Sequence, residues 1–213
     1  MVLACAAARA DTIVEHDEHG YHGGVFDWTW NDPRLSTGIG VGVNLGGGVS
    51  GFTDRAVRDT TSPVGGLWDL RATFGTHLPL AIEVAYLGSA TQIQSLFGHA
   101  SGTLIGTTLE SDLRVNFLPH APIDPYAFVG VGWQRYNVDE PDFNVADTGI
   151  ASRDDVLEIP VGGGIAYRYR GFVTDVRGTF RATRDSRLVL DPDTRTYAPL
   201  HSWGASLSIG YEL

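Results

Sequence analysis

The chain has 213 residues, enough for one all-β domain with a filled interior, and its 27 glycines favour short strands and turns over helices. Its formal net charge is −10, which argues against a nucleic-acid partner because phosphate binding requires a basic face. No stretch approaches the ~18 consecutive apolar residues of a membrane-spanning helix. A membrane is not thereby excluded, since a spanning β-strand needs only ~9–11 residues and one apolar side.

Residues 1–10 resemble the end of an export signal. They read MVLACAAARA, and Ala8-Arg9-Ala10 fits the small-x-small pattern that signal peptidase cuts. Cleavage before Cys5, as in a lipoprotein, and an ordinary alanine-rich terminus are the alternatives. Because the one cysteine lies in this leader-like stretch, we expect no disulfide in the mature chain.

Residues 11–34 are predicted to form a periplasmic N-terminal segment. It contains three histidines at three-residue spacing among carboxylates, namely His16, His19 and His22. Imidazole nitrogens in this pattern suit a divalent transition metal, the one cofactor that the sequence suggests. A solvated, flexible tail is the simpler interpretation.

From residue 35 to residue 213, apolar residues recur at every second position. Between Leu35 and Val49 the odd positions are mostly apolar, whereas the even positions are mostly glycine or small polar residues. This period of two is typical of β-strands with one apolar face. Eight segments show it, so we predict eight antiparallel strands: 35–49, 68–75, 80–86, 105–117, 127–134, 157–170, 174–182 and 203–213.

Charged residues of both signs gather on the non-apolar side of these strands. A charge that faces lipid at mid-bilayer costs roughly 2–4 kcal/mol, which explains why the other side carries almost none. Buried charges persist when they are paired and hydrogen-bonded, so we predict an arginine–carboxylate network that fills the lumen of a barrel. Its predicted members are Asp69, Arg71, Glu83, Glu110, Asp112, Arg114, Glu158, Arg168, Asp175, Arg177, Arg181 and Glu212.

The predicted connections alternate between long and short, as a barrel with one outer and one periplasmic rim requires. The long ones are Thr53–Val64, Ala90–Ser101, Asp139–Asp154 and Arg184–Leu200, and the short ones are Thr76–Pro79, Pro119–Asp124 and Gly171. We expect both termini in the periplasm and the long connections outside the cell. An aromatic girdle is predicted near the short turns, formed by Phe74, Phe117, Tyr126, Tyr167, Tyr169, Phe172 and Tyr211.

The segments Pro125–Gly132 and Ser202–Leu213 resemble strands of the small outer-membrane β-barrel superfamily, typified by the membrane domain of outer membrane protein A. The resemblance implies an eight-stranded, up-and-down transmembrane β-barrel over residues 35–213, located in a bacterial outer membrane. It implies membrane lipid and the outer-membrane assembly machinery as partners, although the last residue is Leu213 where members usually have an aromatic residue. A soluble lipocalin-like barrel is the rival fold, but its outer wall would be less uniformly apolar.

No nucleophile–base–acid constellation is evident, so we expect no enzyme. Barrels of this family that deacylate lipid A use a serine and a histidine two residues apart, whereas His201 and Ser202 are adjacent and should point to opposite faces. His77, His99 and His120 are predicted to be surface histidines. The sequence therefore favours a structural or surface-interaction barrel with an unidentified partner at its outer loops. The alternatives are a lipid A-modifying enzyme and a narrow solute pore, the latter disfavoured because side chains fill an eight-stranded barrel.

Overall fold

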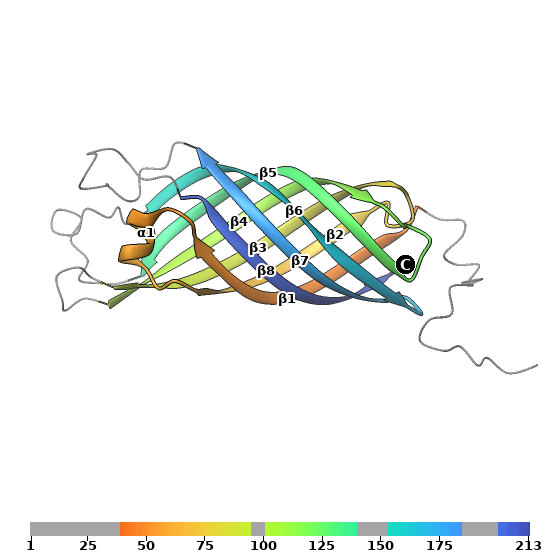
Figure 1. The fold of residues 1–213 in the computed structure, drawn as a ribbon, viewed down its shortest axis with the longest axis horizontal. Helices are drawn as coiled ribbons and strands as arrows, with labels where there is room; N and C mark the ends of the chain where they lie inside the picture. Colours follow the sequence, from red (N-terminus) through yellow and green to blue (C-terminus); the bar gives the residue numbers. More distant parts are fainter. Residues whose placement is uncertain (1–38, 95–100, 140–152, 185–199) are drawn as a thin grey trace, which may run out of the picture.

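The structure is a computed structural model that describes residues 39–94, 101–139, 153–184 and 200–213. Within these residues, eight strands form a closed antiparallel barrel in which each strand pairs with its neighbours in the chain (Figure 1). The predicted fold class is confirmed. The strands are β1 (Val41–Phe52), β2 (Gly65–Phe74), β3 (Leu80–Gln94), β4 (Ser101–Asn116), β5 (Ile123–Asp139), β6 (Arg153–Tyr169), β7 (Phe172–Arg184) and β8 (Ser202–Glu212).

Pairing of the first strand with the last closes the barrel. The register of β1 with β8 runs from Gly42 opposite Glu212 to Phe52 opposite Ser202. Each strand therefore has a hydrogen-bonded neighbour on both sides, and the sheet has no free edge. Closure of this kind satisfies the backbone groups without water, which is the condition for crossing a bilayer with strands.

The alternation of side chains separates an apolar outer wall from a polar lumen. In β8, Trp203, Leu207 and Ile209 are exposed on the outside, whereas Ser206 and Ser208 are buried inside. The same division holds around the barrel, and the exposed wall is built largely of leucine, isoleucine, valine and aromatic residues. An apolar surface of this extent on a small protein is suited to lipid rather than water.

The connections differ in length at the two ends of the barrel. Short turns join β2 to β3, β4 to β5 and β6 to β7, and the last of these is a two-residue hairpin with positive φ at Arg170 and Gly171. The opposite end carries α1 (Arg55–Thr60), far from the C-terminus in Figure 1. This helix was not predicted; it packs its Val57 side chain, which is fully buried, at the end of β1. No helix in the described part of the chain has the length and apolar character needed to cross a membrane.

Several predicted boundaries are wrong. The first strand begins at Val41 rather than Leu35; Gly40, with a φ of 69°, precedes it and accepts a hydrogen bond from Gly75 N at 2.9 Å. Residues 35–38 lie outside the described part of the chain. The long connection predicted from Ala90 is also too long, because β3 continues to Gln94 and pairs there with Ser101. Ladder hydrogen bonds extend the strands past the apolar band, where side-chain polarity no longer alternates.

The apolar wall predicts a strong effect of charge at its middle. Leu207 faces outward, midway along β8 between Trp203 and Tyr211. Leu207→Arg should therefore lower the free energy of unfolding in phospholipid vesicles, and so destabilise the barrel, by about 2–4 kcal/mol. Leu118→Arg is the matched control, since Leu118 is exposed in the short turn between β4 and β5. Equal effects of the two substitutions on equilibrium refolding would contradict a lipid-facing wall.

Candidate functional site in the barrel lumen

The structure places all twelve predicted lumen residues inside the barrel. Each is at most 6% exposed, although all are charged or ionisable. They occupy inward positions on β2, β3, β4, β6, β7 and β8, because every one lies at even spacing from an inward neighbour on its own strand. The ion pairs among them link strands that lie far apart in the barrel wall as well as neighbours.

Arg177 bridges the widest span. It extends from β7 across the lumen to Glu83 of β3, with a short contact from Nη1, and to Asp112 of β4, whose Oδ2 accepts a hydrogen bond from Nη2 at 2.8 Å. Its guanidinium lies 3.4 Å from the centre of the Phe128 ring, a cation–π geometry. A planar guanidinium can bind two carboxylates at once, which suits it to this position.

A second bridge joins β2 to β7. Arg71 Nε donates to Asp69 Oδ1 at 2.8 Å, and its Nη1 donates to Asp175 Oδ1 at 3.1 Å. The same Asp175 oxygen accepts the hydroxyl proton of Tyr126 at 3.0 Å, and Ser208 Oγ accepts a hydrogen bond from Arg71 Nη2 at 3.2 Å. Phenol and guanidinium groups thus meet at the Asp175 Oδ1 atom, whereas Asp175 Oδ2 has no hydrogen-bond partner among the described residues.

Near the end of the barrel that carries α1, Arg181 contacts two glutamates. Arg181 Nε donates to Glu110 Oε1 at 2.5 Å, whereas Glu158 Oε1 lies 3.7 Å from the same nitrogen. The two glutamates flank Gly132, which is opposite Glu110 on β4 and opposite Glu158 on β6. A Cβ at Gly132 would lie 3.0 Å from both Glu110 Cγ and Glu158 Oε1, so glycine provides the room that the pair requires.

The turn between β2 and β3 contributes to the lumen at the end of the barrel that carries the short turns. Glu212 Oε1 accepts the Thr76 hydroxyl at 2.6 Å and lies 2.5 Å from His77 Nε2, while Glu212 Oε2 accepts Arg168 Nε at 3.0 Å. The prediction that His77 is a surface histidine is wrong, since it is only 4% exposed. A buried carboxylate and a close-packed neighbour, Gly40, hold the turn inward.

Two lumen residues were assigned elsewhere by the sequence analysis. Asp124 was placed in a turn, but β5 begins at Ile123, and the fully buried Asp124 carboxylate accepts Arg168 Nη2 at 3.0 Å. Tyr126 was placed in the aromatic girdle, but it is 3% exposed. The Arg114 guanidinium lies over the Tyr126 ring, 3.5 Å from the ring centre. Both lie at even spacing from Phe128, whose side chain is buried, and this spacing is the signal that identifies them.

The remaining predicted residues do not converge on a reactive site. Ser202 is buried in the lumen, whereas His201 is half-buried, accepts Thr183 N at Nδ1 and packs on the Phe180 ring, so the two point to different faces as expected. His120 is exposed. The described residues contain no group of three or more histidines, cysteines or carboxylates arranged to hold a metal. The predicted metal ligands lie outside the described part of the chain: His16, His19 and His22.

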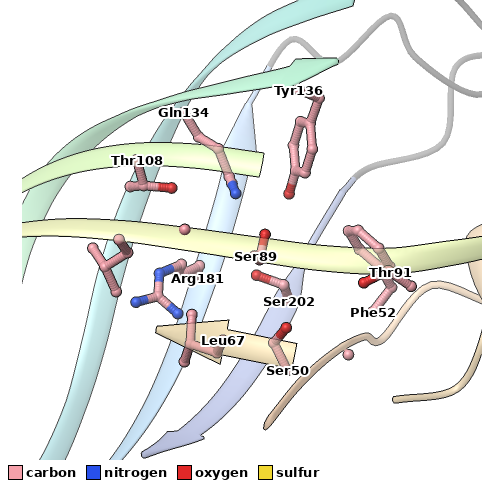
Figure 2. Close-up of a pocket in the computed structure, with 13 residues that line it drawn as sticks. Ser50, Phe52, Leu67, Ser89, Thr91, Thr108, Gln134, Tyr136, Arg181 and Ser202 are labelled. Carbon is pink, nitrogen blue, oxygen red and sulfur yellow. The ribbon is translucent and has the colours of Figure 1, made fainter. Parts of the chain in front are cut away.

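A small cavity lies beside Arg181. Its volume is about 30 Å³, enough for a few water molecules at most. Arg181 and Gln134 line it together with hydroxyl-bearing residues of β1, β3, β4, β5 and β8 (Figure 2). The hydroxyl-bearing residues are Ser50, Ser89, Thr91, Thr108, Tyr136 and Ser202.

A closed barrel of eight strands with an apolar outer wall and a charged, filled lumen defines the class: the chain has the fold of the small β-barrels of bacterial outer membranes. The Neisserial surface protein A structure matches with a TM-score of 0.56 and 12% identity, over 82% of this chain and 97% of that one. The Yersinia pestis attachment invasion locus protein, solved with the heparin analogue sucrose octasulfate, matches with a TM-score of 0.54 and 10% identity, over 82% and 98%.

A third structure of similar fold is the outer membrane protein OprG from Pseudomonas aeruginosa. Its TM-score is 0.51 at 11% identity, over 82% of this chain and 95% of that one. A scan against protein-family models finds no matching family, and a search of curated proteins finds no significant match. The structural likeness at these low identities concerns the fold alone.

The ion pairs across the lumen predict that removal of a buried arginine destabilises the barrel, whereas removal of an exposed arginine does not. Arg177→Met should lower the free energy of unfolding by about 3–5 kcal/mol, because Glu83 and Asp112 would lose their shared cation while buried. The matched control is Arg135→Met, which removes an exposed pair with Asp155 and should leave the unfolding midpoint unchanged. Guanidinium unfolding of the detergent-folded proteins gives both values, and equal midpoints for the two variants would refute a stabilising network.

Proposed function

We propose that this protein is an outer-membrane barrel with a structural or surface-interaction role, in which the lumen is a fixed support for the outer connections. The observation that carries the proposal is the set of ion pairs across the lumen. Each of the five buried arginines contacts two carboxylates, so the two sides of the wall are tied together at several levels.

A lumen filled by side chains supports this function over a solute pore. At the inner end, Thr76 and His77 lie against Glu212, and at the outer end the cavity has room for a few water molecules only. A pore needs a continuous wet path, and eight strands give an interior that side chains fill. We infer that the lumen does not conduct solutes.

The outer ends of the strands support a role at the cell surface. Beyond the apolar wall, Arg135 and Asp155 form an exposed ion pair on β5 and β6, and α1 lies at the same end. Two structures with a similar fold are those of a Neisserial surface protein and a Yersinia pestis attachment protein. We propose that the long connections at this end face the medium and that both termini face the periplasm.

Cysteine labelling of intact Gram-negative host cells tests the location and orientation. In a Cys5→Ser background, Arg58→Cys in α1 should react with a membrane-impermeant maleimide, because Arg58 is exposed at the end that carries the long connections. Leu118→Cys, in a short turn at the opposite end, should react only after the outer membrane is permeabilised. The reverse pattern of labelling would contradict the orientation, and no labelling before lysis at either position would contradict the location.

Planar-bilayer recording tests the filled lumen. The purified, folded protein should produce no stable unitary conductance. Arg177→Met should produce transient openings at most, because the substitution removes an ion-pair bridge across the lumen. A steady conductance of the unmodified protein would favour the pore over the structural barrel.

A further inference from the structure

The hydrogen-bond ladder between β5 and β6 is interrupted near its middle. Pairing stops after Val129 with Val161 and resumes three residues further along β5, so two residue pairs are missing. The first missing pair would join Gly130 to Pro160. The other seven ladders of the described barrel run without a break.

Pro160 removes a hydrogen-bond donor from the wall at this point, because proline has no backbone N–H. Arg168, an even number of residues further along β6, donates its N–H to Pro122 O on the β5 side at 2.8 Å. Backbone N–H groups at alternate residues of a strand point to the same neighbouring strand, so the donor that Pro160 lacks would face β5. The carbonyl oxygen of Gly130 is therefore left without its ladder partner.

Side chains do not reinforce the ladder at the interruption. Gly130 is the inward residue opposite Pro160, and Gly132 is the next inward residue, opposite Glu158. Cross-strand side-chain pairs contribute to the stability of a sheet, and a glycine cannot form one. Two consecutive inward pairs between β5 and β6 therefore lack this contribution.

Ion pairs hold β5 to β6 on both sides of the interruption but not at it. Arg168 Nη2 donates to Asp124 Oδ2 at 3.0 Å toward the short-turn end, and Arg135 pairs with Asp155 toward the other end. Residues 125–134 of β5, which lie between these two pairs, include no charged residue. A separation of the two strands would therefore be confined to the stretch around Gly130.

A carboxylate oxygen without a hydrogen-bond partner lies on the lumen side of the same stretch. Asp112 is opposite Gly130 on β4, and its Oδ1 is buried and has no partner among the described residues. A Cβ at Gly130 would collide with this oxygen, so the two residues are in close contact. Water that reached this point would supply donors to both Asp112 Oδ1 and the Gly130 carbonyl.

We propose that the barrel wall opens locally between β5 and β6, around Gly130 and Pro160, and admits water there while the other ladders stay closed. Opening costs less here than elsewhere in the wall, because one backbone hydrogen bond is already absent and entering water bonds to acceptors that lack donors. The ion pairs at each side limit the movement to the middle of the two strands. The wall thus contains one site of local opening within an otherwise continuous ladder.

Amide hydrogen exchange of the detergent-folded protein, measured residue by residue by NMR, tests the proposal. The N–H groups of Gly130 and Gly132 should have protection factors about tenfold lower than those of Glu83 and Asp112, which pair in the uninterrupted ladder between β3 and β4. This comparison is made within the unmodified protein and depends on no variant.

Pro160→Ala should raise the protection of Gly130 and Gly132 about tenfold, because alanine supplies the N–H that the Gly130 carbonyl lacks. Pro125→Ala is the matched control. Pro125 also lies in β5, but its carbonyl accepts Phe117 N at 3.0 Å on the β4 side, so the added N–H would point away from β6. This control should leave the protection of Gly130 and Gly132 unchanged.

Three results would each overturn the proposal. The first is protection of Gly130 and Gly132 equal to that of Glu83 and Asp112 in the unmodified protein. The second is a folded Pro160→Ala variant in which the protection of the two glycines does not rise. The third is an equal rise in the Pro125→Ala variant.

Discussion

Closure of the backbone hydrogen-bond ladder is the constraint from which the other features of this barrel follow. In lipid, the N–H and C=O groups of a strand can bond only to the next strand, so the pairing of β1 with β8 leaves no unsatisfied edge. A closed ladder forces side chains to alternate between the outer wall and the lumen. Because lipid accepts only the apolar set, every charge on these strands within the bilayer is directed inward.

The inward charges then require partners in a space too narrow for bulk water. Arginine fills this need at five positions, each time bridging two carboxylates from different strands. Glycine gives these long side chains room at the points of closest approach, as at Gly132 between Glu110 and Glu158 and at Gly130 beside Asp112. The lumen is therefore filled by ion pairs that connect opposite sides of the barrel wall.

Period-two alternation predicted the strands, and the side of the wall on which each charged residue lies, because both depend only on the ladder. Features that depend on distant contacts were not predictable in the same way. His77 lies in a turn, where no period fixes its direction, and its inward position depends on Glu212 at the far end of the sequence. Tyr126 and Asp124 were misassigned because a turn was extended into β5, although their spacing from Phe128 was informative. The short helix α1 carries no apolar period long enough to detect.

SDS gel mobility of the detergent-folded protein, with and without boiling, tests most directly whether the chain forms a lipid-facing barrel whose lumen is filled by ion pairs. A closed ladder with buried ion pairs should resist SDS at room temperature, so the unboiled protein should migrate apart from the boiled one. Identical mobility of the two samples, together with solubility of the folded protein in the absence of detergent, would contradict the apolar outer wall as a membrane surface.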